Sequence, residues 1–216
     1  MNRLHRWMCR SSFWEKFLQM EMLPWALKDV DLGQDLLEVG PGPGLTTDFL
    51  RVRFQRVTAL EVDPALADSL KRRMSGTNVT VIQGDATALP FEDGQFSGAV
   101  AFTMLHHVPS PTLQDRLLGE VHRILRPGGM FAGTDSVWSP GLWLIHIGDT
   151  LVPVDPRRFK SRLESVGFAD IHIELGRRGS GSGPDVLRSF VRERLSGATP
   201  RLMFPSKVET PRPYAK

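Results

Sequence analysis

The sequence has very little cysteine and no long apolar run. Cys9 is the single cysteine among 216 residues, so it forms no intrachain disulfide and provides no cysteine-based cluster, and we expect no metal site. No stretch approaches the roughly 18 consecutive apolar residues that a membrane-spanning helix needs. The basic start is typical of a signal peptide, but Arg10, Glu15 and Lys16 interrupt the apolar run that should follow. We therefore expect a cytoplasmic protein.

The excess of basic residues is small and unevenly placed. The chain has 27 Lys and Arg against 24 Asp and Glu. Residues 176–216 hold nine of the basic and three of the acidic residues, so residues 1–175 are mildly acidic. A basic tail can bind nucleic acid or an acidic partner, but a solvated tail has the same composition. We expect a small-molecule substrate rather than nucleic acid, and no feature specifies an oligomeric state.

Strands and helices alternate along most of the chain. Buried-type strands are predicted at residues 36–39, 56–63, 78–82, 96–102, 130–134 and 171–175, with helices at 45–50, 64–74, 112–125 and 155–166. This alternation predicts an α/β fold with a doubly wound, mainly parallel sheet and helices on both faces. In such sheets the ligand lies beyond the carboxyl ends of the strands.

Three segments depart from this alternation. Residues 1–30 contain an amphipathic helix that Ser11 and Ser12 precede and that should end near Pro24, covering one edge of the domain. The main domain is expected to span residues 31–176. Within it, residues 137–153 fit neither the strand nor the helix periodicity, and they look like an apolar insertion. Residues 177–216 form a basic, Gly/Pro-rich tail, in which the apolar spacing of residues 186–195 predicts a helix.

A glycine-rich turn follows the first predicted strand. Gly40, Gly42 and Gly44 have no side chains, so the backbone there can approach a ligand closely and adopt positive φ. Glu61, 21 positions beyond Gly40 at the end of the second strand, can bond both hydroxyls of a ribose. This pattern indicates a nucleoside cofactor, either a dinucleotide or S-adenosylmethionine.

Two further features separate these cofactors. The dinucleotide fingerprint places its third glycine where this chain has Leu45. It also leaves Asp85 and Ala86, at the end of the third strand, without a role. A carboxylate followed by a free amide can accept from adenine N6 and donate to N1, which favours S-adenosylmethionine.

These motifs together resemble those of the class I S-adenosylmethionine-dependent methyltransferases, especially the small-molecule group that includes the ubiquinone and menaquinone methyltransferases. The resemblance rests on residues 36–44, 61–63, 84–91, 96–107 and 123–129. It implies a Rossmann-like fold, S-adenosyl-L-methionine as cofactor and a small-molecule methyl acceptor. Members of this family end with a strand inserted antiparallel between the fifth and sixth, for which this sequence has no clean equivalent.

The resemblance also implies roles for individual residues. Glu38 and the glycine turn would hold the amino-acid end of the cofactor, Glu61 its ribose, Asp85 and Ala86 its adenine, and Phe102 and Thr103 would lie near the sulfonium. Glu38 could instead be a strand-end carboxylate that bonds local groups.

The acceptor side is less specific. His106 and His107, just after the fourth strand, can offer a base or only shape the pocket. Trp143 and His146, in the insertion, can belong to a lid over an apolar or aromatic acceptor, or to a helix packed on the core. Asp135 can bind substrate or cap the insertion. Two other functions remain open at this point: a nicotinamide-dependent oxidoreductase, and a non-catalytic binding module that uses the basic tail.

Overall fold

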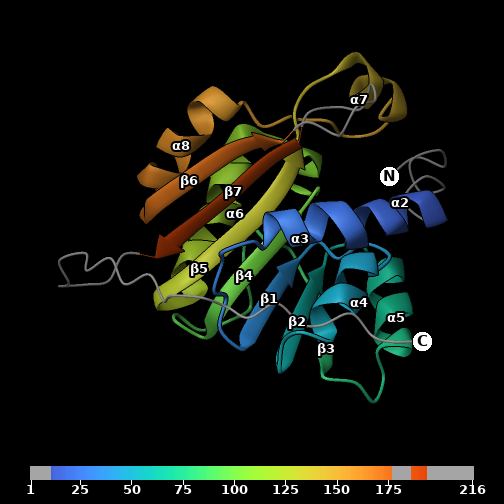
Figure 1. Cartoon of the computed structure of the whole chain (residues 1–216). Helices are drawn as coiled ribbons and strands as arrows, with labels where there is room; N and C mark the ends of the chain where they lie inside the picture. Colours follow the sequence, from blue (N-terminus) through green and yellow to red (C-terminus); the bar gives the residue numbers. More distant parts are fainter. Residues whose placement is uncertain (1–10, 177–185, 194–216) are drawn as a thin grey trace, which may run out of the picture.

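The alternating apolar runs form a single sheet. The computed structural model describes residues 11–176 and 186–193 of the chain (Figure 1). The strands are β1 (Asp35–Val39), β2 (Arg56–Glu61), β3 (Val79–Gln83), β4 (Phe96–Phe102), β5 (Leu125–Ser136), β6 (Phe168–Gly176) and β7 (Val186–Glu193). They lie in the order β3-β2-β1-β4-β5-β7-β6.

Strands β1 to β5 are mutually parallel, as predicted. Chain connections from β1 run outward to β2 and β3 on one side, while β4 and β5 lie on the other side. The switch point therefore falls between the carboxyl ends of β1 and β4, where open α/β sheets bind ligands.

Strand β7 corrects the prediction for the end of the chain. The spacing of residues 186–195 predicts a helix, but residues 186–193 form a strand that pairs antiparallel with both β5 and β6. Short apolar runs fit both periods, and here pairing on two sides satisfies the backbone of an interior strand. Ser189 and Val191 are accordingly buried. The sheet thus continues past residue 176, where we expected the main domain to end.

One face of the sheet is covered by the N-terminal helices together with α4 (Leu45–Arg51) and α5 (Pro64–Arg73). The N-terminal helix begins as expected, since the Ser11 side chain caps α2 (Ser12–Phe17) by accepting from the Trp14 amide. It continues through a π-helical turn, η1 (Leu18–Met22), into α3 (Leu23–Ala26), and so ends close to Pro24, as predicted. Pro24 is tolerated because it lies in the first turn of α3.

The opposite face is covered by α6 (Pro111–Ile124) and α8 (Pro156–Ser165). Successive residues of β1 point to opposite faces, so Leu36 joins the core under the N-terminal helices and Leu37 joins the core under α6 and α8. Burial on both faces explains why the central strands are almost wholly apolar.

The expected insertion contains α7 (Pro140–Ile145), which stands beyond the carboxyl end of β5 and apart from the two helical layers (Figure 1). No helix in the described ranges is both long and apolar enough to cross a membrane. Apart from β7, the tail predicted at residues 177–216 lies outside the described residues, as do residues 1–10 of the N-terminal segment.

Candidate active site

The turn between β1 and α4 has the left-handed backbone that its glycines allow. Gly40, Gly42 and Gly44 have φ of +67°, +55° and +83°. A Cβ atom on Gly40 would lie 3.1 Å from the side chain of Met104, which packs over the turn. All three glycines therefore allow the backbone conformation, and at Gly40 the missing side chain also allows the close approach of Met104.

Arg73, at the end of α5, holds the outer side of this turn. Its Nη2 donates to the Pro43 carbonyl at 2.8 Å, and its Nη1 pairs with Asp48 of α4. A Cβ on Gly44 would lie 2.3 Å from Arg73 Nη2 and 2.4 Å from Leu70 Cδ1. Arg73 was not among the predicted site residues, and its distance of 29 positions from Gly44 left no local signal in the sequence.

Glu61 connects the end of β2 to the glycine turn. Its carboxylate is 5 % exposed, and Oε2 accepts from the Gly42 amide at 2.9 Å while Oε1 accepts from the Asp63 amide at 3.0 Å. An ionised carboxylate has about four acceptor positions, so these two bonds fix its direction and leave capacity for further donors.

Glu38 lies beneath the turn, in contact with the first turn of α4. The Thr47 hydroxyl donates to its Oε2 at 2.6 Å, and the Thr46 hydroxyl donates to its Oε1. Burial raises the pKa of Glu38 to about 7, against the opposing effect of these two hydroxyl bonds. The charges of Asp48 and Glu61 raise this pKa further. These contacts agree with the second interpretation of Glu38, in which the carboxylate at the end of the strand bonds nearby protein groups.

The end of β3 presents a carboxylate and an amide side by side. Asp85 is exposed, and its Oδ1 accepts from the Thr87 amide at 2.8 Å. The Ala86 side chain is buried, and within the described residues the Ala86 amide has no hydrogen-bond acceptor. This pair therefore has one carboxylate oxygen and one N–H available to a planar group that offers a donor next to an acceptor.

The end of β4 bends sharply toward the acceptor side. Phe102 is buried, and Thr103 has φ of +49°, which is unusual for a β-branched residue. The Thr103 amide donates to the Thr134 carbonyl of β5 at 2.7 Å, which holds this conformation. The chain then enters a 3₁₀ turn, η2 (Leu105–His107), which carries both predicted histidines.

Asp135, at the end of β5, fixes the position of His106. His106 Nδ1 lies 2.5 Å from Asp135 Oδ1, and because an ionised carboxylate only accepts, Nδ1 carries the proton. Asp135 also accepts from the amides of Leu105 at 2.8 Å, His106 at 3.3 Å and Ser136 at 2.7 Å. It is 4 % exposed, so it lies beneath His106 with its acceptor positions occupied.

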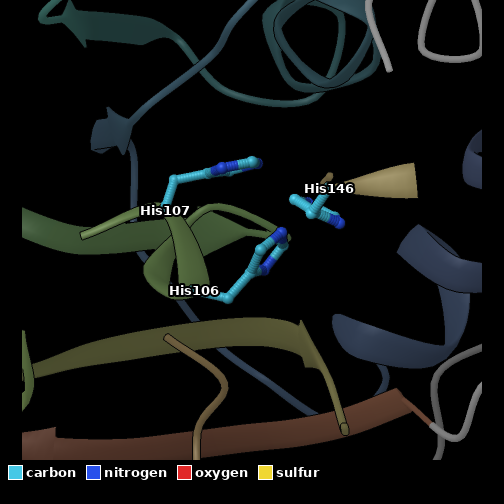
Figure 2. Close-up of side chains that lie close together, drawn as sticks. All are labelled: His106, His107 and His146. Atoms are coloured by element: carbon cyan, nitrogen blue, oxygen red, sulfur yellow. The ribbon is translucent and has the colours of Figure 1, made fainter. Parts of the chain in front are cut away.

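His146, just after α7, reaches the same place from the insertion. Its Nδ1 donates to the Leu142 carbonyl at 2.7 Å, and burial lowers the pKa of its ring. Figure 2 shows the rings of His106, His107 and His146 turned toward one another. The ring centroids of His106 and His107 are 4.2 Å apart, and each lies 5.1 Å from that of His146.

Helix α7 has one buried and one exposed apolar side. Leu142 and His146, four positions apart, are both buried on its inner side. Trp143 and Leu144 are 57 % and 58 % exposed, and the segment also exposes Trp138 and Ile147. Trp143 therefore lies on a different side of α7 from the histidine cluster.

The predicted residues thus fall into two groups. Those at the ends of β1 to β4 are Glu38, Gly40, Gly42, Gly44, Glu61, Asp85, Ala86, Phe102 and Thr103. His107, Asp135 and His146 instead gather around His106. Sequence reasoning missed Thr46 and Thr47, although two hydroxyl residues directly after the last glycine, in the first turn of a helix, were a usable signal.

Comparisons with known proteins agree with this geometry. Residues 37–133 match the model of a family described as a methyltransferase domain. An uncharacterized methyltransferase of Synechocystis sp. is 32 % identical over 130 residues, covering 60 % of this chain and 58 % of that protein. A fatty-acid O-methyltransferase of Mycolicibacterium smegmatis is 35 % identical, covering 51 % of this chain and 40 % of that protein. The chain thus spans about half the length of these two relatives.

A solved structure shares the fold at low identity. Phosphoethanolamine N-methyltransferase 2 of Haemonchus contortus, in complex with S-adenosyl-L-methionine, has a TM-score of 0.66 and 13 % identity, covering 90 % of this chain and 60 % of that chain. The family match favours S-adenosylmethionine over a dinucleotide as the cofactor, and a methyltransferase over a nicotinamide-dependent oxidoreductase. Over residues 37–133 the chain is thus similar to a family of methyltransferase domains, and its fold is shared with a methyltransferase solved with S-adenosyl-L-methionine.

Proposed function

We propose that this chain transfers the methyl group of S-adenosylmethionine to a small acceptor that is apolar or aromatic. The observation that carries the proposal is the alignment of three distinct polar features at the ends of three adjacent parallel strands. These are the glycine turn after β1, Glu61 at the end of β2, and the Asp85–Ala86 pair after β3.

Each feature matches one part of the cofactor. The left-handed glycine turn lets the amino-acid end approach the backbone, and Glu61 is held so that it can accept from two ribose hydroxyls. Asp85 and the Ala86 amide complement the amino group and N1 of adenine. Glu38 acts through Thr46 and Thr47, by holding the first turn of α4 against the glycine turn.

The reaction asks little of protein side chains. The positively charged sulfur already makes the methyl carbon electrophilic, and the acceptor attacks it in line with the bond to sulfur. Holding the two reactants at contact distance and excluding water supply most of the acceleration. The bend at Thr103 directs the chain from the cofactor side toward the histidines, which supports an acceptor position between η2 and α7.

An apolar or aromatic acceptor is supported by the composition of the segment next to this site. Trp138, Trp143 and Leu144 expose large apolar side chains, which a soluble surface rarely groups without a use. One relative is a fatty-acid O-methyltransferase, whose name specifies an apolar acceptor. The segment can therefore act as a lid that buries the acceptor.

Calorimetry with S-adenosylhomocysteine tests the cofactor site. We expect Glu61→Ala and Asp85→Ala each to weaken binding tenfold or more, which corresponds to about 1.4 kcal/mol. Asp93→Ala is a matched control, because Asp93 is exposed and precedes β4, at the amino ends of the strands rather than the carboxyl ends. Unchanged affinity in both site variants would remove the assignment, as would binding of NAD in place of S-adenosylhomocysteine.

The acceptor can be sought by methyl-group tracing. The full chain is incubated with methyl-labelled S-adenosylmethionine and a cell extract, and the label is followed after partition between water and an organic solvent. We expect the label in the organic phase. A label that stays wholly in the aqueous phase or on macromolecules would contradict an apolar small-molecule acceptor.

A further inference from the structure

The histidine cluster contains a buried nitrogen atom that methyl transfer alone does not explain. Nε2 of His106 is buried and has no hydrogen-bond partner. One ring nitrogen from each of His106, His107 and His146 lies within 4.8 Å of those of the other two. Leaving a buried polar nitrogen without a partner costs about 1–3 kcal/mol, so His106 Nε2, beside ring nitrogens of two further histidines, points to a ligand.

We propose that His106, His107 and His146 bind a divalent transition-metal ion of the zinc type, through one ring nitrogen each. In two of the three rings the proton is on Nδ1, which leaves Nε2 able to bind a metal ion. His106 Nδ1 donates to the Asp135 carboxylate and His146 Nδ1 donates to the Leu142 carbonyl. Because Nδ1 carries the proton in both rings, the Nε2 atom of each keeps its lone pair.

This pattern is the one that orients histidine ligands in metal sites. A ligating imidazole commonly donates its other N–H to a carboxylate or a backbone carbonyl, which fixes the ring and makes the ligating nitrogen more basic. Here His106 donates to a carboxylate, that of Asp135, and His146 donates to a backbone carbonyl, that of Leu142.

The spacing is open but within reach of a metal. Zinc–nitrogen bonds of about 2.0–2.1 Å place the ligand atoms of a tetrahedral site roughly 3.4 Å apart. The cluster, with separations up to 4.8 Å, has to close by about 1.4 Å at most. His146 belongs to the insertion, just after the short helix α7, so a small shift of α7 toward η2 is sufficient.

The ligand set also indicates the role of the ion. Imidazole nitrogens suit zinc and neighbouring transition metals rather than magnesium or calcium. Three protein ligands leave a fourth position open, as in catalytic rather than structural zinc sites. Because Asp135 has its acceptor positions filled by protein donors, an exogenous oxygen is the expected fourth ligand.

This role rests on the proposed function and narrows it to acceptors that carry a hydroxyl group. A hydroxyl bound to the ion releases its proton to solvent more readily. The resulting oxygen forms a bond to the methyl carbon as the carbon–sulfur bond breaks, and that electron pair goes to sulfur, yielding neutral S-adenosylhomocysteine. The histidines then hold the ion, and none of them has to act as the base.

Cobalt titration of the full chain tests the site directly. The protein is treated with a chelator, dialysed, and titrated with Co²⁺, whose visible absorption is strong in a tetrahedral site and weak in an octahedral one; Zn²⁺ is then added as competitor. The variants are His146→Ala, His106→Ala and Asp135→Asn. His172→Ala is the matched control, because His172 is exposed on β6 and outside the cluster.

We expect one Co²⁺ per chain with tetrahedral absorption, displaced by Zn²⁺. His146→Ala and His106→Ala should weaken binding at least tenfold, Asp135→Asn should weaken it about 10–100-fold as a positioning residue, and His172→Ala should match the parent. Circular dichroism shows whether each variant is folded. If a histidine variant does not fold, His107→Ala is used in its place, because His107 is only half-buried. No stoichiometric binding by the parent, or parent-like binding by His146→Ala, would overturn the proposal and leave His106 as a metal-free base or a packing residue.

The two proposals fail separately. S-adenosylhomocysteine binding is measured by calorimetry on the same metal-free protein. Cobalt binding without S-adenosylhomocysteine binding would refute the proposed function while the metal site stands. The reverse result would refute the metal site alone.

Discussion

Replacing Glu38 by glutamine should change how the stability of the protein depends on pH. The folded-state pKa of Glu38 is about 7, above its ordinary 4.5, mainly because the carboxyl is fully buried. A raised pKa means that the folded state binds the proton more tightly than the unfolded state. The contribution of this group to stability is therefore complete below pH 4.5 and is lost as pH rises through 7.

The size of this effect follows from the two pKa values. A difference of one in pKa corresponds to about 1.4 kcal/mol, so the ionised carboxylate costs the folded state about 3 kcal/mol well above pH 7. From about pH 5.5 to about pH 8 the parent should lose about 2 kcal/mol that the glutamine variant keeps. The amide still fits, because the hydroxyls of Thr46 and Thr47 can accept as well as donate.

Urea unfolding of both proteins at several pH values between these limits measures the difference. Comparing parent and variant cancels the histidines that titrate in the same range. Glu120→Gln is the matched control, because its bond to Arg123 lowers the pKa of Glu120, and its contribution is lost only as pH falls below the ordinary carboxyl range. Parallel curves for the parent and Glu38→Gln would refute the reasoning.

Three further predictions concern the turn, the sheet and the lid. Gly44→Ala should lower stability by about 1–3 kcal/mol in thermal unfolding and weaken S-adenosylhomocysteine binding, because alanine is strained at φ +83° and its Cβ would collide with Arg73. Gly76→Ala is the control: this glycine also has positive φ but has open space around it, so the substitution should leave binding unchanged. Removal of residues 177–216 should give an aggregating protein in light scattering, because the edge of β5 would be exposed, and a monomeric, cooperatively unfolding product would contradict this. Leu142→Ala, on the buried side of α7, should raise the KM for an apolar acceptor severalfold with unchanged S-adenosylhomocysteine affinity in calorimetry, whereas Trp143→Ser, on the exposed side, should change it less. Equal kinetics in the parent and Leu142→Ala would remove α7 from the acceptor site.

The fold was predictable where a strand is buried on both faces. The runs that became β1, β2 and β4 are short and apolar, and each is followed by a turn or helix start that marks its end. Polar residues just beyond those ends could therefore be placed at one edge of the sheet by sequence alone. Strand β7 was missed because its apolar residues repeat at a helical spacing, and only pairing with β5 and β6 selects the strand.

The candidate site was predictable in the same uneven way. Glu61 and Asp85 follow strands directly, so their neighbourhood depends on the sheet alone. The meeting of His106 with His146 depends instead on the path of residues 137–153, which follows no simple period. The link between His106 and Asp135 required the register of β4 against β5, which the sequence does not specify.

The position of β7 has a consequence for how the protein is made. Within the described residues this strand comes last in the chain, yet it lies between β5 and β6. During synthesis the preceding strands can assemble, but the partners of β7 stay apart until residues 186–193 have left the ribosome. The nascent chain therefore passes through a stage with two unpaired strand edges, and a chaperone that covers them should raise the yield of folded protein.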